Sequence, residues 1–339
     1  MKKRITKVVS LFLIFSILLV GCSTSNTQND TSQNETSDEK SEFKAAVLTI
    51  RKLTTPADLN TLDGINKLKD ELGIDIKIVE CIEISEYKEQ VQALSEEGYD
   101  VIYFIYDNFL EAVEEIAPNY PDTKYIGLWI DKPDHNLANF KPLFFRPEQG
   151  AFLSGVVAAL TTETNQVGFI GGGINPGILT FLAGYEAGIK YIDPDVELAV
   201  SWAGTFEDPL KGKELGTSLY GRGVDVIFQV ANQTGLGVIH SAKEQNKYAI
   251  GVDVDQSDLA PGNVVASCLL DHGYATYDSI KQAYEGNFNT EQVYYGLKEG
   301  MNVVAIPDFV SQDVKDKVKE IEEKIINGEI TIPKTTETR

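Results

Sequence analysis

Aromatic and carboxylate side chains follow apolar runs in the second half of this 339-residue chain. Phe206 comes shortly after the run Leu198–Trp202, and Asp253 comes directly after Tyr248–Val252. A phenyl ring on a loop can stack on a heteroaromatic ring, and a carboxylate can accept hydrogen bonds from hydroxyl groups. The pair therefore suits the binding of an uncharged ring compound that carries hydroxyls. Taken alone, however, Phe206 is better explained as a core residue.

Further candidates follow other apolar runs. Asn232 comes after Val226–Val230, and Tyr106 and Asp107 come at the end of a run that begins at Val101. Amide and carboxylate groups in these places could bind the polar edge of the same ligand. A solvated turn rich in Asp and Asn would contain the same residue types, so both interpretations remain open.

Three glycines, Gly171–Gly173, follow the run Val167–Ile170 and precede Asn175 and Pro176. Asn175 can cap the helix that Pro176 opens. Bare backbone amides around Gly172 would suit a polar ligand group at the helix start. The spacing matches neither a dinucleotide-binding fingerprint nor a Walker A motif. A tight turn between strand and helix explains the glycines equally well.

The sequence gives little support for catalysis. His135, His240 and His272 lack the spacing of zinc-binding or Cys-His motifs, and the chain has no G-x-S-x-G motif. We therefore expect a protein that is not an enzyme and that needs no cofactor or metal. A hydrolase with two carboxylates from distant loops remains an alternative.

These candidates must be positioned by an α/β fold, because apolar runs typical of buried parallel strands alternate with helical patterns. Tyr87, Val91 and Leu94, for example, have the spacing of a helix with one buried face. In open parallel sheets ligands bind at the carboxyl ends of the strands, where the candidates lie. The expected strands are Ala45–Ile50, Ile76–Val79, Val101–Tyr106, Tyr125–Trp129, Val167–Ile170, Leu198–Trp202, Val226–Val230, Tyr248–Val252 and Val264–Cys268.

An internal repeat divides the chain. The pattern L-x-x-x-G-x-D-V-I-aromatic begins at Leu94 and again at Leu219, and K-Y-I-G at Lys124 has a counterpart at Lys247. Two matches at nearly the same offset favour duplication of an α/β unit, although similar punctuation by helix-ending glycines could produce each of them. We expect two doubly wound parallel sheets.

Composition excludes several classes of protein. The chain has 30 Lys and Arg against 51 Asp and Glu, for a net charge of −21. Such a charge repels phosphate backbones, so we expect no binding of a nucleic acid polymer. With 42% hydrophobic residues the chain can bury one large core or two medium ones, which excludes a disordered or fibrous protein.

The first 42 residues predict a location. Basic residues up to Lys7 and the mostly apolar segment Val8–Val20 are typical of a signal peptide, since a membrane-spanning helix needs about 20 apolar residues. Leu19 to Cys22 resembles a bacterial lipobox, which predicts removal of residues 1–21 and acylation, for example by palmitate, of Cys22. Residues 22–42 would be a disordered tether to the cell membrane. A plain secretory signal is the alternative.

The two other cysteines, Cys81 and Cys268, lie in apolar surroundings and have no neighbouring cysteine. Free buried thiols are therefore expected rather than a disulfide framework.

Several segments together resemble the basic membrane protein family of ABC-transporter lipoproteins, the purine nucleoside receptor-like group. The resemblance runs from about Tyr99 to the C-terminus. It is carried by Gln166-Val-Gly-Phe-Ile-Gly-Gly, Gly184-Tyr-Glu-Ala-Gly188, Asp208-Pro-Leu-Lys-Gly-Lys213, Gly223-Val-Asp-Val-Ile-Phe228, Thr234-Gly-Leu-Gly-Val238 and Tyr248-Ala-Ile-Gly-Val-Asp253-Val-Asp-Gln-Ser257.

The resemblance implies a type I periplasmic-binding-protein fold, in which two doubly wound lobes joined by crossover strands close on a nucleoside. The protein would pass this ligand to an ABC permease at the extracytoplasmic face of the cell membrane. The expected N-terminal lobe consists of residues 43–142 and about 268–290, and the expected C-terminal lobe of about 143–267 and 291–339.

Carried over to this chain, the resemblance implies that Phe206 stacks on the base and that Asp253 accepts the ribose hydroxyls. The N-terminal lobe departs from the family pattern D-x-S-F-N, because Thr54-Thr-Pro-Ala-Asp58 stands there and keeps only an acidic residue, Asp58, in place of Asn. The usual lysine after Val264–Cys268 is replaced by Leu270.

Three explanations follow. Tyr103, Tyr106 or Trp129 could replace the missing aromatic platform for a nucleoside. The pocket could instead have changed to another heteroaromatic such as a flavin. The protein could also be a membrane-anchored sensor or partner-binding lipoprotein that delivers no cargo.

Overall fold

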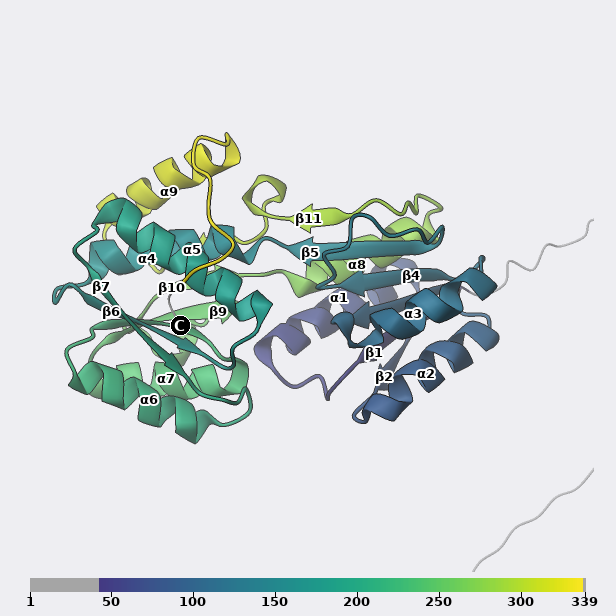
Figure 1. Cartoon of the computed structure of the whole chain (residues 1–339), viewed down its shortest axis with the longest axis horizontal. Helices are drawn as coiled ribbons and strands as arrows, with labels where there is room; N and C mark the ends of the chain where they lie inside the picture. The colour runs from purple at the N-terminus through teal and green to yellow at the C-terminus, as the bar shows by residue number, and fades with distance from the viewer. Residues whose placement is uncertain (1–42, 338–339) are drawn as a thin grey trace, which may run out of the picture. The chain divides into compact units, whose positions relative to one another are not determined.

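Two six-stranded sheets organise residues 43–337, the part of the chain that this computed structural model describes (Figure 1). The first sheet has the order β11-β5-β4-β3-β1-β2, and all its strands are parallel. Its strands are β1 (Ala45–Thr49), β2 (Ile76–Glu80), β3 (Val101–Ile105), β4 (Lys124–Leu128), β5 (Phe140–Phe145) and β11 (Val293–Tyr295).

The second sheet has the order β12-β10-β9-β8-β6-β7, in which only β12 is antiparallel to its neighbour. Its strands are β6 (Gln166–Gly171), β7 (Glu197–Trp202), β8 (Val226–Val230), β9 (Tyr248–Asp253), β10 (Val264–Leu269) and β12 (Val304–Ala305).

The two sheets repeat one another. The order β5-β4-β3-β1-β2 corresponds strand by strand to β10-β9-β8-β6-β7. The strands β3 and β8, which contain the repeated sequence pattern, occupy the same central place in their sheets, and each follows a glycine with left-handed φ, Gly98 at 72° and Gly223 at 106°. The two doubly wound sheets predicted from the strand and helix patterns are present, and the fold is the type I periplasmic-binding-protein fold that the family resemblance implied.

Helices cover both faces of each sheet (Figure 1). In the first lobe α1 (Pro56–Leu72) and α8 (His272–Tyr284) cover one face, and α2 (Ile84–Glu96) and α3 (Leu110–Ile116) cover the other. In the second lobe α4 (Pro147–Thr161) and α5 (Pro176–Ile192) lie opposite α6 (Pro209–Gly221) and α7 (Asn232–Gln245), and α9 (Gln312–Ile326) packs on α4.

Local sequence signals begin several of these helices. The side chains of Asn175 and Asp208 cap α5 and α6, and a proline opens each of them, as expected. Ser311 precedes α9 but makes no side-chain capping bond. The expected helix face of Tyr87, Val91 and Leu94 is buried.

Three connections join the lobes, and they follow β5, β10 and β11. The expected division assigned residues 291–339 to the second lobe, but Val293–Tyr295 forms β11 and pairs with β5 in the first sheet.

The sequence prediction missed β5, β11 and β12. In β5 the residues Lys141 and Pro142 interrupt the apolar pattern. The Lys141 ammonium is buried and donates hydrogen bonds to the amide oxygens of Gln282 and Asn289, so tertiary contacts replace its hydration. The other two strands have only three and two residues, too few for a periodic signal.

Helices α4 and α5 pack with their backbones in close contact at glycines. A Cβ atom added to Gly188 would overlap the carbonyl oxygen of Phe152. We expect Gly188→Ala to lower the free energy of unfolding by about 1–3 kcal/mol, because the two helices must separate. Urea denaturation measures this loss.

Gly221 at the exposed end of α6 provides the matched control, since a Cβ there meets no atom within 4 Å. Gly221→Ala should leave stability within about 1 kcal/mol of the wild type. Equal stability of both variants would contradict this account of the α4–α5 contact.

Cys81 and Cys268 are buried free thiols, as predicted. Cys22 and the expected tether lie outside the described residues. No helix within residues 43–337 is long and apolar enough to cross a membrane.

Candidate functional site

The predicted site residues lie at the carboxyl ends of neighbouring parallel strands. In the second lobe these ends belong to β7, β6, β8 and β9, which are adjacent in that order and about 5 Å apart. In the first lobe they belong to β4, β3 and β1. The residues at the second-lobe edge are Phe206, Gly172, Asn232 and Asp253, and those at the first-lobe edge are Trp129, Tyr106, Asp107 and Asp58.

The backbone is strained at three of these positions. Of the described residues, those other than Gly and Asn with φ in the left-handed region are Tyr106 (81°), Trp129 (68°) and Asp253 (71°). This conformation is uncommon for residues other than glycine, above all for the bulky Tyr and Trp, and such strain concentrates at functional sites. All three were predicted from residue type, from position after a strand or from the family resemblance, none of which uses backbone conformation, so backbone geometry is an independent indication of a site.

Phe206 is half-buried and lies on bare backbone. A Cβ atom on Gly172 would overlap its ring, and a Cβ on Gly173 would lie 3.3 Å from it. Gly172 therefore makes room for the phenyl ring, a role that differs from the amide contact expected for it.

Thr234 fixes the loop that carries Phe206. Its backbone N–H donates to the Phe206 carbonyl at 3.2 Å, and its hydroxyl donates to the Thr205 carbonyl, also at 3.2 Å. The same hydroxyl accepts a hydrogen bond of 2.9 Å from the Asp208 amide. These contacts, all within the second lobe, fix the backbone of the loop that carries the ring.

Asn232 has a half-buried side chain with an enclosed Oδ1 that has no hydrogen-bond partner among the described residues. An unsatisfied buried acceptor is costly, so this oxygen is available to a donor on a ligand. The nearby Gln229 is different: its amide donates to Gln256 at 2.8 Å and its oxygen accepts from the Ala231 amide at 3.2 Å. Gln229 supports the loop.

Asp253 is the titratable group of the second-lobe edge. Its side chain is half-buried, and loss of hydration raises the pKa of the carboxyl to about 7. The positive charge of Arg51 acts in the opposite direction. Asp58 raises the pKa further. Asp253 therefore lies within electrostatic reach of the first lobe.

Asp58, in the first lobe, is buried and fully engaged. Its carboxylate accepts hydrogen bonds from the backbone amides of Thr54 and Thr55 at 3.3 and 3.0 Å, which caps α1. It also forms an ion pair with Arg51 at 3.1 Å. Its observed contacts are thus those of a residue that positions Arg51.

Arg51 is the residue that the sequence analysis missed. Its Nη2 donates to the Tyr106 hydroxyl at 2.9 Å, and its guanidinium lies over the Tyr106 ring at 5.2 Å. It is one of five arginines in a strongly acidic chain and stands two residues after β1. Those two facts could have identified it.

The aromatic candidates of the first lobe occupy different environments. Tyr103 lies fully inside the core with its hydroxyl accepting from Thr276, so it cannot serve as a platform. Trp129 is half-buried, with ring centroids 5.2 Å from Phe145 and 5.9 Å from His272. Burial lowers the pKa of His272 to about 4, so this aromatic group is uncharged at neutral pH.

Asp107 is exposed and heads a short 3₁₀ turn. No contact joins it to the other predicted site residues within the described chain. The structure thus groups Asp58, Tyr106 and Asp253 electrostatically and seats Phe206 on Gly172, whereas Asp107 stands apart.

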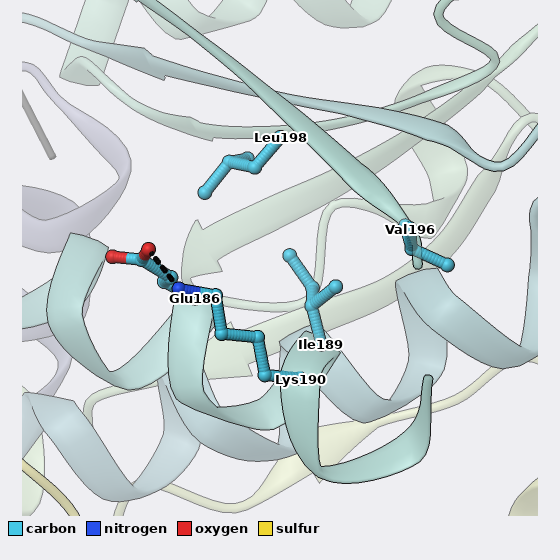
Figure 2. A pocket seen from close by; sticks show the side chains of 5 residues that line it. All are labelled: Glu186, Ile189, Lys190, Val196 and Leu198. Atoms are coloured by element: carbon cyan, nitrogen blue, oxygen red, sulfur yellow. Dashed lines mark hydrogen bonds and ion pairs between the residues drawn. The ribbon is translucent and has the colours of Figure 1, made fainter. Parts of the chain in front are cut away.

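Two surface cavities lie away from these residues. One, of about 240 Å³, lies between α1 and α8 and includes Asn60, Lys67 and Tyr277. The other, of about 150 Å³, is a groove beside α5 and β7 (Figure 2). Glu186 and Lys190 form an ion pair at its rim. Residues 43–337 contain no group of three or more His, Cys, Asp or Glu that could hold a metal ion.

Comparison with known proteins gives a consistent result. The family model described as ABC transporter substrate-binding protein PnrA-like matches residues 57–336. Basic membrane protein A of Borreliella burgdorferi is 34% identical over 288 residues, which cover 82% of this chain and 84% of that protein. The ABC transporter nucleoside-binding protein BmpA of Lactococcus lactis is 28% identical over 359 residues, which cover 98% of this chain and 99% of that protein.

Solved structures agree on the fold. A solute-binding protein of an ABC transporter system from Aeropyrum pernix superposes with a TM-score of 0.78 and 25% identity, covering 87% of this chain and 94% of that one. A solute-binding protein from Conexibacter woesei gives a TM-score of 0.72 at 19% identity, covering 86% and 99%.

Proposed function

Because the chain belongs to the family of PnrA-like ABC transporter substrate-binding proteins, we propose that it captures a nucleoside, in particular a purine nucleoside, between its two lobes. It then delivers this ligand to an ABC permease. The protein acts by binding and release, without catalysis and without a cofactor.

The packing of the Phe206 ring is the main observation that supports the proposal. Its half-buried ring rests on the glycine backbone of Gly172 and Gly173, and its loop is fixed by Thr234. A fixed ring at the carboxyl edge of a parallel sheet is a stacking platform for a planar heteroaromatic ring. A purine offers such a ring.

Asp253 and Asn232 supply the polar part of the site. Asp253 ends β9 and Asn232 follows β8, which lies between β9 and the strand β6 that leads to Gly172, and both residues have a left-handed backbone. The Asp253 carboxylate accepts the ribose hydroxyls, and the unpartnered Asn232 oxygen accepts a ligand N–H or O–H. The name of the Lactococcus lactis relative, a nucleoside-binding protein, is consistent with this ligand class.

The proposed location is the extracytoplasmic face of the cell membrane. Acyl chains on Cys22 anchor the protein, and residues 22–42 connect the anchor to the folded lobes. A tethered receptor of this kind stays near its permease while the lobes remain in the aqueous phase.

Native mass spectrometry of the protein as purified tests the ligand class. We expect a retained mass equal to that of a purine nucleoside, or, after the ligand is removed, a thermal shift with guanosine, inosine or adenosine but not with riboflavin. Retention of a flavin would replace the nucleoside by another heteroaromatic. Absence of any shift across the panel would favour a sensor that carries no cargo.

The mass of the polypeptide in the same spectra tests the anchor. Processing before Cys22 and acylation should give a chain that lacks residues 1–21 and carries added acyl mass. An unacylated chain would indicate an ordinary secretory signal.

A further inference from the structure

Arg51 has hydrogen-bonding capacity that its own lobe does not use. Its Nε donates to Asp58 Oδ2 at 3.4 Å and its Nη2 to Asp58 Oδ1 at 3.1 Å, so one edge of the guanidinium is occupied by the carboxylate. The second hydrogen of Nη2 goes to the Tyr106 hydroxyl. Within residues 43–337, no acceptor binds the two hydrogens on Nη1.

Tyr106 extends this donor edge. Its hydroxyl accepts from Arg51 at 2.9 Å, and no acceptor for its own proton is found in the described chain. Nη1 and the tyrosine hydroxyl therefore present two neighbouring donors. The pair is held rigidly, because Asp58 is fixed by two backbone amides and the Arg51 side chain is only 25% exposed.

The surrounding charge selects the kind of acceptor. Arg51 and Asp58 neutralise each other, and Asp253 adds a negative group within electrostatic reach. This carboxylate, in a strongly acidic protein, would repel an anionic ligand such as a phosphate. It would not repel an uncharged hydrogen-bond acceptor.

A 6-oxopurine carries two adjacent uncharged acceptors, O6 and N7, and paired donors of an arginine recognise this edge specifically. Adenine has an amino group at position 6, so one donor would face another. We propose that Arg51, together with the Tyr106 hydroxyl, reads the O6/N7 edge of the base and makes the protein selective for guanosine and inosine over adenosine. This inference rests on the proposed nucleoside function.

Arg51→Lys tests the inference by calorimetry on the purified protein. The wild type should bind guanosine and inosine about tenfold or more tightly than adenosine. Lysine still balances Asp58 but offers a single flexible ammonium, so the preference should fall to about twofold or less. Lys52→Gln, which changes the exposed lysine next to Arg51, should leave the preference for guanosine unchanged.

A change in the ligand tests the same contact from the other side. 7-Deazaguanosine lacks the N7 acceptor, so its affinity for the wild type should be about tenfold lower than that of guanosine. For the variant Arg51→Lys, the two nucleosides should have equal affinities. Thermal unfolding checks that each variant is folded. Should Arg51→Lys fail to fold, Tyr106→Phe keeps the arginine and removes the second donor, and it should lower the preference for guanosine about threefold.

The outcomes separate the two proposals. Nucleoside binding with the same preference in the wild type and the variants would overturn the role of Arg51 alone, as would a wild type that prefers adenosine. Failure of the wild type to bind any nucleoside would overturn the proposed function and this inference together.

Discussion

Phe206→Ala is expected to weaken nucleoside binding by about five- to 150-fold, because stacking of a base on an aromatic ring contributes about 1–3 kcal/mol. The ring packs on Gly172 and Gly173, and hydrogen bonds from Thr234 in the same lobe fix its loop. Little ordering is therefore required on binding, and most of the stacking energy appears as affinity. Isothermal titration with inosine measures the loss.

Phe309→Ala is a suitable control for this experiment. Phe309 is 50% exposed and lies in the loop before α9, away from the strand ends that carry the site. Its removal should leave the affinity unchanged. Unaltered affinity in Phe206→Ala as well would show that the ring is not the platform.

The second large effect is a dependence of binding on pH that arises from Asp253. Burial raises the pKa of this carboxyl to about 7, and the ribose hydroxyls bind its ionised form. Below pH 7 the ligand must displace a proton, so the affinity for inosine at pH 6 should be about tenfold lower than at pH 8. Titrations at several pH values measure the profile.

Two comparisons isolate the carboxylate. Asp253→Asn should remove the pH dependence, and the free base hypoxanthine, which has no ribose, should bind the wild type with a flat profile between pH 6 and pH 8. An equally steep profile for hypoxanthine would contradict ribose recognition by Asp253.

The same group should affect stability with the opposite sign. An unfolded Asp has a pKa near 3.9. Between that value and about pH 7 the folded protein holds a proton on Asp253 that the unfolded chain has lost. Stability without ligand should therefore fall as pH rises through this range and level off above pH 7. In Asp253→Asn this decrease should be absent.

The sequence predicted the parts of the fold that depend on local signals. The caps at Asn175 and Asp208 and the buried runs need only neighbours in the chain to be recognised. The repeated pattern predicted duplication of an α/β unit, and β3 and β8, which contain it, occupy the same place in their sheets. By contrast, β5 could not be recognised from the sequence, because it contains the charged residue Lys141. The residues that bind the buried ammonium lie more than a hundred positions away in the chain.

Candidate site residues were easier to choose from the sequence in the second lobe than in the first. Phe206 and Asp253 could be found because each follows a recognisable strand and matches a family position. Arg51 could not be assigned in the same way, because its geometry depends on Asp58 and on Tyr106, 55 residues away. Tyr103 and Tyr106 are both near the end of β3, and only the packing of α8 shows that Tyr103 is internal.

The order of the chain through the two sheets has a consequence for synthesis. The five parallel strands of the second sheet lie between residues 166 and 269, whereas the first sheet receives its cover α8 and its edge strand β11 only after residue 271. A chain that emerges N-terminus first therefore presents β1–β5 with one apolar face covered by α1 but not yet by α8 until nearly the whole polypeptide has appeared. The second lobe can assemble meanwhile. The first lobe is thus the part of the nascent chain that needs protection from aggregation, although it is made first.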